Sequence, residues 1–284
     1  MITIKAYISE ITQKLQKLYA KEEAKSIAEY VVREVLRISN TELLCSENII
    51  LDEMALNELI EKESRLLAGE PVQYVTEVAW FYGLKFYVCK EVLIPRQETE
   101  ILVKTIFDRF KDKHTCKILD IGTGSGCIAV SVKKLMPQHH IFAIDISKKA
   151  ISVCRHNCKK NNVKVICSVA NIFAKDIFAD NKKFDIIVSN PPYVLESEKK
   201  RMHNNVTKYE PDIALYVKDT DPLKYYHAIS SFANDRLAGK GTLIVEINER
   251  FSEEVIKIHK DAGFLQNEII FDLNNKPRFI QSTK

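Results

Sequence analysis

The four residues Asn190-Pro191-Pro192-Tyr193 have the types and spacing to hold a planar NH2 group. Neither proline has a backbone N–H, and each disfavours the helical region for the residue before it, so we expect a stiff, extended corner. That corner would fix the Asn190 amide, the Pro191 carbonyl and the Tyr193 ring relative to one another. The same residues can form an ordinary turn, so the surrounding sequence has to decide between a turn and a site.

A second group of residues is typical of a nucleotide-containing cofactor site. A predicted strand over 117–121 runs into a turn at a helix start, Gly122-Thr123-Gly124-Ser125-Gly126. Glycines there allow positive φ and let a ligand lie directly on the backbone, facing the helix N-terminus. The next predicted strand ends in Asp145, 19 residues after Gly126, where a carboxylate would accept the ribose hydroxyls of an adenosine cofactor.

The details of these two groups favour methyl transfer over hydride transfer. The turn reads G-x-G-x-G, and Cys127 stands where the dinucleotide-binding fingerprint needs its third glycine. No residue resembling a hydride-transfer acid or base accompanies Asn190 and Tyr193. S-adenosyl-L-methionine carries its own activated methyl group, so the protein needs only to aim a nucleophile at it. We therefore predict S-adenosyl-L-methionine as the cofactor.

Both groups lie in a part of the chain where short apolar runs alternate with helical segments. Such alternation predicts a mainly parallel sheet covered on both faces, with ligands bound beyond the carboxyl ends of the strands where strand order reverses. The strands are expected at 117–121, 140–145, 163–168, 184–189, 241–247, 265–272 and 277–281. The helices are expected at 125–135, 148–160, 222–238 and 251–261, after an earlier one that ends near 110.

The first part of the chain has a different pattern. Apolar residues at steps of three and four predict helices near 4–18, 22–38 and 52–68, with Asp52 as a plausible N-cap of the third. Residues 71–95 show the alternation of a β-hairpin. We thus predict a helical domain over 1–70, a hairpin linker over 71–95 and a catalytic domain over 96–284.

Composition limits the partners and the compartment. The 284 residues include 42 Lys and Arg against 38 Asp and Glu, a formal charge of +4 that lacks the strong basic bias of a dedicated nucleic-acid binder. No apolar run approaches the ~20 residues that span a bilayer. The sequence has seven cysteines, an odd number, and shows no signal-peptide pattern. Both observations predict a cytoplasmic protein with reduced thiols. Cys154 and Cys158 should share a helix face away from His156, so no metal site is expected.

With these blocks in place, the sequence resembles the PrmC/HemK family, the glutamine N5-methyltransferases of peptide-chain release factors. The resemblance spans nearly the whole chain. It is carried by Gly69-Glu70-Pro71 with Gln73-Tyr74, Leu93 to Arg96, Glu98 to Glu100, Asp120 to Gly126, Asn190 to Tyr193, Tyr209-Glu210-Pro211 with Ala214-Leu215, Glu246, and Asp272 with Arg278. It implies a class I, Rossmann-like α/β methyltransferase with a seven-stranded mixed sheet, an N-terminal helical bundle that recognises the substrate, and a monomer whose partner is a release factor.

The resemblance also implies roles for single residues. Gly122 to Gly126 would hold the methionine part of the cofactor, with Asp120 near its amino group. Asn171 and Ile172 would contact the adenine, and Asn190 would meet both cofactor and substrate. The sequence departs from the family pattern at Gln97, Asn171, Ile172, Asn248 and Arg250. An Asn oxygen at 171 can still accept from the adenine amino group, so we expect weaker or differently oriented cofactor binding.

These roles give a mechanism in which Asn190, Pro191 and Tyr193 are catalytic and, with Pro192, bind the substrate. A carboxamide nitrogen is a poor nucleophile because its lone pair is delocalised, with a rotation barrier of ~18–20 kcal/mol. If the glutamine NH2 donates to the Asn190 oxygen and the Pro191 carbonyl, a pyramidal nitrogen becomes favourable. Tyr193 would pack on the carboxamide, and no general base is required before attack.

Two other functions compete with this one. The same corner would serve a DNA or RNA methyltransferase that acts on an exocyclic adenine or guanine amine, with Tyr193 stacked on a flipped base. A protein that binds the cofactor but has lost catalysis is the other; Asn171 and Ile172 favour it, and the intact Asn190, Pro191 and Tyr193 oppose it.

Overall fold

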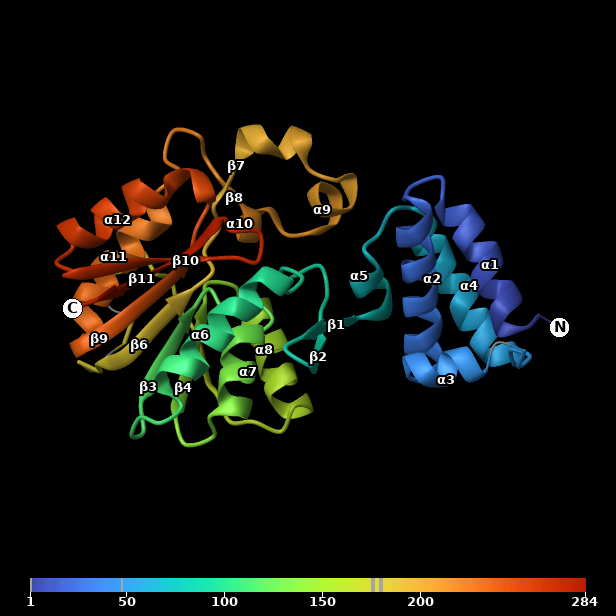
Figure 1. The fold of residues 1–284 in the computed structure, drawn as a ribbon, viewed down its shortest axis with the longest axis horizontal. Helices are drawn as coiled ribbons and strands as arrows, with labels where there is room; N and C mark the ends of the chain where they lie inside the picture. Colours follow the sequence, from blue (N-terminus) through green and yellow to red (C-terminus); the bar gives the residue numbers. More distant parts are fainter. Residues whose placement is uncertain (1, 47, 175–176, 179–180) are drawn as a thin grey trace. The chain divides into compact units, whose positions relative to one another are not determined.

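The protein forms two compact units in a computed structural model that describes residues 2–46, 48–174, 177–178 and 181–284 (Figure 1). The first unit comprises Met1–Val78 and His203–Tyr209, and the second comprises Ala79–Met202 and Glu210–Lys284. The segment 203–209 lies in sequence within the expected catalytic domain, yet it packs with the helical unit.

The first unit is a bundle of helices around its own apolar core. The predicted helices are confirmed as α1 (Ile4–Leu15), α2 (Lys21–Leu36) and α4 (Glu53–Leu67). Asp52 caps α4 as expected, since its Oδ1 accepts from the Ala55 N–H at 2.7 Å. The sequence did not predict α3 (Asn40–Cys45), α5 (Val72–Thr76) or α9 (Asn204–Tyr209), all of which have six residues or fewer. Such short helices carry too little apolar periodicity to be recognised.

The second unit is built on the predicted seven-stranded mixed sheet, in the order β10-β11-β9-β6-β3-β4-β5. Neighbouring strands from β9 to β5 pair in parallel, and β11 runs antiparallel to both β9 and β10. The strands are β3 (Lys117–Ile121), β4 (His140–Asp145), β5 (Ile166–Val169), β6 (Phe184–Ser189), β9 (Leu237–Glu246), β10 (Gln266–Phe271) and β11 (Pro277–Thr283). Strand order reverses between β3 and β6, which is where the sequence predicted a ligand site.

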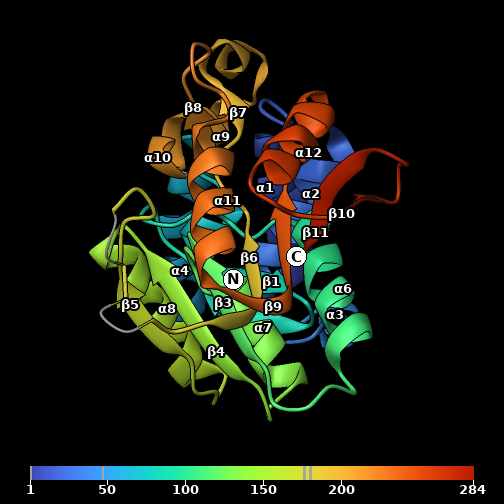
Figure 2. The ribbon, with the colours of Figure 1, turned by 90° about the vertical axis from the view of Figure 1, so that its left-hand side faces the viewer.

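Helices cover both faces of this sheet (Figure 2). Leu119, Ile121 and Ile187 point to the face of the sheet that α11 and α12 bury. The alternate residues of β3 and β6 point to the opposite face. The helices are α6 (Glu100–Phe110), α7 (Cys127–Leu135), α8 (Lys148–Lys160), α11 (Lys224–Arg236) and α12 (Ser252–Asp261). The apolar contacts on the two faces hold the strand ends in fixed register.

Two other parts of the second unit lie outside the main sheet. The predicted hairpin is confirmed as β1 (Val78–Phe81) and β2 (Leu84–Tyr87). The segment after the Asn-Pro-Pro-Tyr corner was not predicted to be ordered. It contains β7 (Val194–Leu195) paired in parallel with β8 (Tyr216–Val217), a 3-10 helix (Glu196–Arg201) and α10 (Asp212–Leu215).

Element boundaries differ from the prediction where a helix end or a glycine intervenes. The strand expected from residue 163 begins at Ile166 because the Val163 N–H donates to the Cys158 carbonyl and closes the end of α8. The helix expected from residue 125 begins at Cys127 because Gly126 has a left-handed φ of 82°. Within the described ranges, no helix is both long and apolar enough to cross a membrane.

Candidate active site

The carboxyl ends of four parallel strands open into one pocket of the second unit. Its empty space, counted out into the solvent at the open mouth, is about 910 Å³. Of the residues predicted to bind the cofactor, those lining it are Gly122, Gly124, Asp145, Asn171, Ile172 and Asn190. The structure therefore brings together residues from the ends of β3, β4, β5 and β6.

The glycine-rich turn presents its backbone to this pocket. The N–H groups of Gly122 and Thr123 donate to the Ile144 carbonyl at 2.9 and 3.0 Å, which ties the turn to β4. Gly122 and Gly124 have φ of 72° and 53°, and apart from their chain neighbours no atom of the described residues lies within 4 Å of where a Cβ would stand. Thr123 and Ser125 are buried, and neither side chain lines the pocket. They support the turn from behind, and the two glycines are the part that faces a ligand.

Asp145 organises the turn as well as facing the pocket. Its Oδ2 accepts from the Gly124 N–H and its Oδ1 from the Ser147 N–H, both at 2.9 Å. Burial raises the pKa of Asp145 above its usual value, and these two hydrogen bonds oppose that effect. Each oxygen keeps a second lone pair for a ribose hydroxyl. One side chain thus fixes the glycine turn and offers the acceptors that the sequence predicted.

Asp120 is fully buried beneath the same turn. Its Oδ2 accepts from the Thr123 hydroxyl at 2.6 Å, while Oδ1 has no hydrogen-bond partner among the described residues. Burial raises the pKa of Asp120 to about 7. Asp120 does not line the pocket, so its contact with the methionine amino group stays a prediction.

The far end of the pocket has aromatic walls that the sequence analysis missed. Asn171 and Ile172 line it as predicted, but the Asn171 Oδ1 already accepts from the Phe173 N–H at 3.0 Å. Phe173 and Tyr225 also line the pocket, with ring centroids 5.3 Å apart. Ile172 departs from the aromatic that the family usually has, and these two rings offer a planar base another apolar surface.

The Asn-Pro-Pro-Tyr corner lies between two pockets. Asn190 and Pro191 line both the large pocket and a smaller one of about 290 Å³ empty space, whereas Tyr193 lines only the smaller. Pro192 lines the large pocket. A methyl donor in the large pocket and a methyl acceptor in the small one would therefore meet at Asn190 and Pro191.

Thr99 and Glu246 hold the corner through a chain of hydrogen bonds. The Thr99 hydroxyl donates to the Glu246 Oε2 at 2.8 Å and accepts from the Asn190 Nδ2 at 3.2 Å. The Tyr193 hydroxyl donates to the other oxygen, Oε1, at 2.9 Å. Burial raises the pKa of Glu246 to about 7, and the two donors oppose that effect. Neither Thr99 nor Glu246 was predicted to be a site residue; their presence in the family blocks was the only signal.

Of the residues that depart from the family pattern, Asn248 lies beside these hydrogen bonds and Arg250 lies at the surface. Asn248 Nδ2 donates to the Tyr193 carbonyl at 3.3 Å, so Asn248 helps to hold the corner. Arg250 is exposed and pairs with Glu198 at 3.1 Å. Gln97 begins a 3-10 turn (Gln97–Thr99) that leads to Thr99.

An ion pair with a buried carboxylate joins two other family blocks at the smaller pocket. Arg96 Nη2 donates to the Glu210 Oε1 at 2.6 Å, and the Ile94 N–H donates to the Glu210 Oε2 at 3.2 Å. Glu210 is 5% exposed. Breaking such a pair would leave an uncompensated buried charge, so Arg96 and Glu210 fix the wall that faces Tyr193.

Comparison with known proteins agrees with this architecture. Residues 6–76 match the PrmC N-terminal domain and residues 97–209 match the methyltransferase small domain. A crystal structure of a methyltransferase from Pyrococcus furiosus has a TM-score of 0.53 at 18% identity, covering 79% of this chain and 98% of that one. At that identity, the likeness shows the fold alone.

Full-length relatives are more informative. The release factor glutamine methyltransferase of Flavobacterium psychrophilum is 36% identical over 98% of each chain. That of Bacteroides thetaiotaomicron is 36% identical over 100% of each chain. The chain therefore belongs to the release factor glutamine methyltransferase family.

Proposed function

We propose that this protein methylates the side-chain amide nitrogen, N5, of the glutamine in the Gly-Gly-Gln loop of peptide-chain release factors, with S-adenosyl-L-methionine as the donor. The observation that carries the proposal is the orientation of Asn190. Because its Nδ2 donates to Thr99, its Oδ1 is left to accept from a substrate. That oxygen and the Pro191 carbonyl are the two acceptors that a primary carboxamide needs.

The proposed cofactor residues fit the donor. Gly122, Gly124 and Asp145 would hold its methionine and ribose parts, with Asn171, Ile172 and the Phe173–Tyr225 pair at its adenine. When bound, S-adenosyl-L-methionine supplies a methyl group on a sulfonium, which is electrophilic without further activation.

The residues of the chain act on the substrate amide. The two amide hydrogens donate to the Asn190 Oδ1 and to the Pro191 carbonyl. These hydrogen bonds hold both hydrogens on the side of the nitrogen that faces away from the large pocket. The nitrogen becomes pyramidal, its lone pair faces the large pocket, and the rest of the carboxamide packs against Tyr193. Fixing this orientation removes much of the entropic part of the barrier. The methylated nitrogen is cationic and releases one proton to solvent, so no base has to act first.

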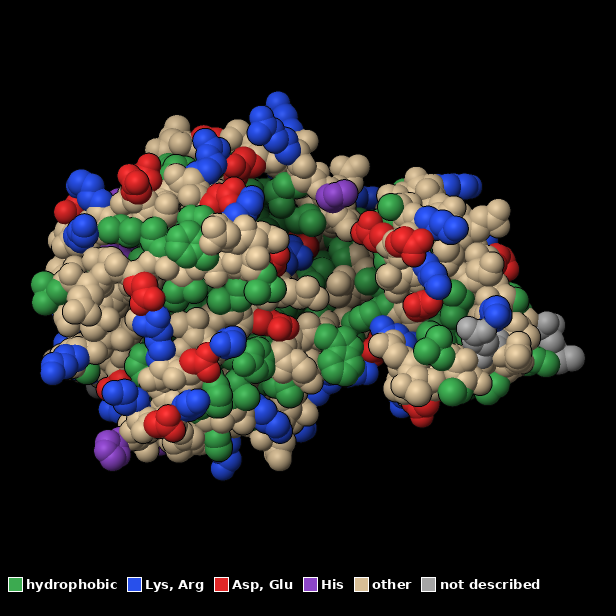
Figure 3. All heavy atoms as spheres, viewed as in Figure 1, with side chains coloured by type: hydrophobic (Ala, Val, Ile, Leu, Met, Phe, Trp, Pro, Cys, Tyr) green, Lys and Arg blue, Asp and Glu red, His purple; other side chains and the backbone are tan. Residues whose placement is uncertain are grey.

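Methylation of an exocyclic amine of DNA or RNA is the weaker candidate. On the face drawn in Figure 3, basic side chains are mostly interspersed with acidic ones instead of forming one large basic surface. Such a mixture supports a protein substrate over a polyanion. We further propose a cytoplasmic monomer without stable nucleic-acid or membrane binding, whose N-terminal helical unit recognises the release factor.

A transfer assay tests the substrate. The protein is incubated with methyl-labelled S-adenosyl-L-methionine and, separately, a release factor, DNA or RNA. We expect label only on the release factor, and mass spectrometry should place one methyl on the side-chain nitrogen of the Gly-Gly-Gln glutamine. A release factor with that glutamine replaced by Asn is the control. Label on nucleic acid alone would overturn the assignment.

Asn190→Ala should lower turnover by at least about 100-fold, because it removes one of the two acceptors that orient the amide. Cofactor affinity, measured by calorimetry, should change by no more than a few-fold. Asn274→Ala, which alters an exposed asparagine in the turn between β10 and β11, is the matched control. Full activity in Asn190→Ala would contradict the mechanism.

Thr99→Val should lower kcat by about 10- to 100-fold, because the loss of a hydrogen bond of about 1–3 kcal/mol leaves the Asn190 amide free to rotate. The KM for the cofactor should stay nearly constant. Thr99→Ser keeps the hydroxyl and should restore most of the activity. If Val and Ser behave alike, Thr99 serves only in packing and does not position Asn190.

Asp145→Ala should weaken cofactor binding by at least about 10-fold, since it removes charge-assisted hydrogen bonds worth about 1.5–3 kcal/mol each. Equilibrium binding of S-adenosyl-L-methionine measures this. Asp261→Ala, at an exposed residue paired with Lys257, should bind normally. Unchanged affinity in Asp145→Ala would show that the ribose assignment is wrong.

A further inference from the structure

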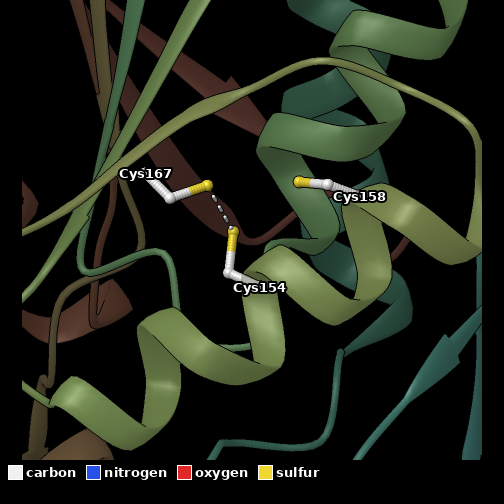
Figure 4. Close-up of side chains that lie close together, drawn as sticks. All are labelled: Cys154, Cys158 and Cys167. Atoms are coloured by element: carbon white, nitrogen blue, oxygen red, sulfur yellow. Dashed lines mark hydrogen bonds between the residues drawn. The ribbon is translucent and has the colours of Figure 1, made fainter.

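Three buried thiols gather behind the glycine-rich turn. Cys154 and Cys158 lie one turn apart on α8, and Cys167 lies on β5, against which α8 packs. Figure 4 shows the three sulfur atoms pointing toward a common centre. All three Sγ atoms lie within 4.8 Å of one another, and those of Cys154 and Cys167 are 3.5 Å apart. All three cysteines are free.

Only part of this cluster was foreseen from the sequence. Cys154 and Cys158 share the buried face of α8 as expected, and His156 lies on the exposed side, 5.0 Å from the Tyr87 ring. Cys167 completes the group because β5 lies beside α8, a pairing that sequence spacing alone does not give.

We propose that Cys154, Cys158 and Cys167 form a binding site for one thiophilic metal ion of the class of Zn²⁺ and Cd²⁺. A Zn–S bond of about 2.3 Å places the sulfurs of a tetrahedral site about 3.8 Å apart. The existing separations, from 3.5 Å up to the 4.8 Å limit, bracket that value. Small side-chain adjustments would therefore suffice to complete the site.

The local charge suits thiolate ligands. The Arg155 guanidinium lies next to the cluster, where it donates to the Cys167 carbonyl at 2.7 Å. Binding of a divalent ion would release the thiol protons to solvent. The three thiolates and the ion would carry one net negative charge, close to Arg155. No other Cys, His, Asp or Glu among the described residues joins the cluster, which leaves a fourth position for water.

The cluster is mechanically connected to the cofactor turn. A Cβ on Gly126 would lie 2.7 Å from the Cys154 Sγ, so this sulfur packs directly against the turn. On the same helix, Asn157 Nδ2 donates to the Ser125 carbonyl at 2.9 Å. A metal ion that draws the Cys154 sulfur inward would shift the surface on which the turn rests. We therefore expect the ion to weaken cofactor binding. This link rests on the proposed cofactor site, whereas the metal site does not.

Titration of the fully reduced protein with Cd²⁺ tests the site. We expect one equivalent to bind, with an ultraviolet charge-transfer band from sulfur to metal. Cys158→Ser should weaken binding by at least about 10-fold, while Cys45→Ser, at an exposed cysteine in the first unit, should leave it unchanged. No band, or the same titration in Cys158→Ser, would overturn the site.

Two measurements on the unaltered protein do not depend on how well a variant folds. X-ray absorption of the Zn²⁺-loaded protein should show three sulfur neighbours at about 2.3 Å; a shell of only nitrogen and oxygen would exclude the site. S-adenosyl-L-methionine should bind several-fold more weakly to the loaded protein, and a chelator should reverse the change. Equal affinity in the loaded and metal-free protein would overturn the link while leaving the proposed function intact.

Discussion

The geometry of the candidate active site depends on how the buried carboxylate of Glu246 is satisfied. A buried charge is costly unless its oxygens accept hydrogen bonds, and the two donors within reach are the hydroxyls of Thr99 and Tyr193. Once Thr99 has given its proton to Glu246, it can only accept, so Asn190 must turn its NH2 toward Thr99. The Asn190 oxygen is thereby left for the substrate. Below pH about 7, Glu246 is protonated and can itself donate to Thr99. The Thr99 hydroxyl is then free to donate to Asn190, and the orientation of the Asn190 amide is no longer fixed.

The same principle, a carboxylate that orders backbone or side-chain donors, recurs on the cofactor side. Asp145 accepts from the backbone N–H groups of Gly124 and Ser147 and so couples the glycine turn to the start of α8. Asn190 and Pro191 belong to the walls of both pockets. Two separately ordered pockets therefore share one rigid wall, which suits direct transfer between their occupants.

Much of this could be predicted from the sequence. The strands β3, β4 and β6 and the helix α8 occur with the predicted bounds, because turn-forming or capping residues stand at their ends, such as Gly122 after β3 and Ser147 before α8. The glycine turn, Asp145 and Asn190 were also recognisable from local spacing. In contrast, Thr99 and Glu246 are 147 residues apart, and only the folded chain brings them together. Phe173 and Cys167 were missed for the same reason: their roles depend on neighbours from other elements.

The orientation of Asn190 is tested most directly by a high-resolution structure of the protein with S-adenosylhomocysteine and a glutamine-containing release-factor peptide. The chain of hydrogen bonds from Glu246 predicts that the peptide amide nitrogen lies about 2.7–3.2 Å from both the Asn190 Oδ1 and the Pro191 carbonyl, with Nδ2 still on Thr99. A complex in which the Asn190 Nδ2 faces the peptide, or in which the amide lies outside the pocket lined by Tyr193, would contradict the account.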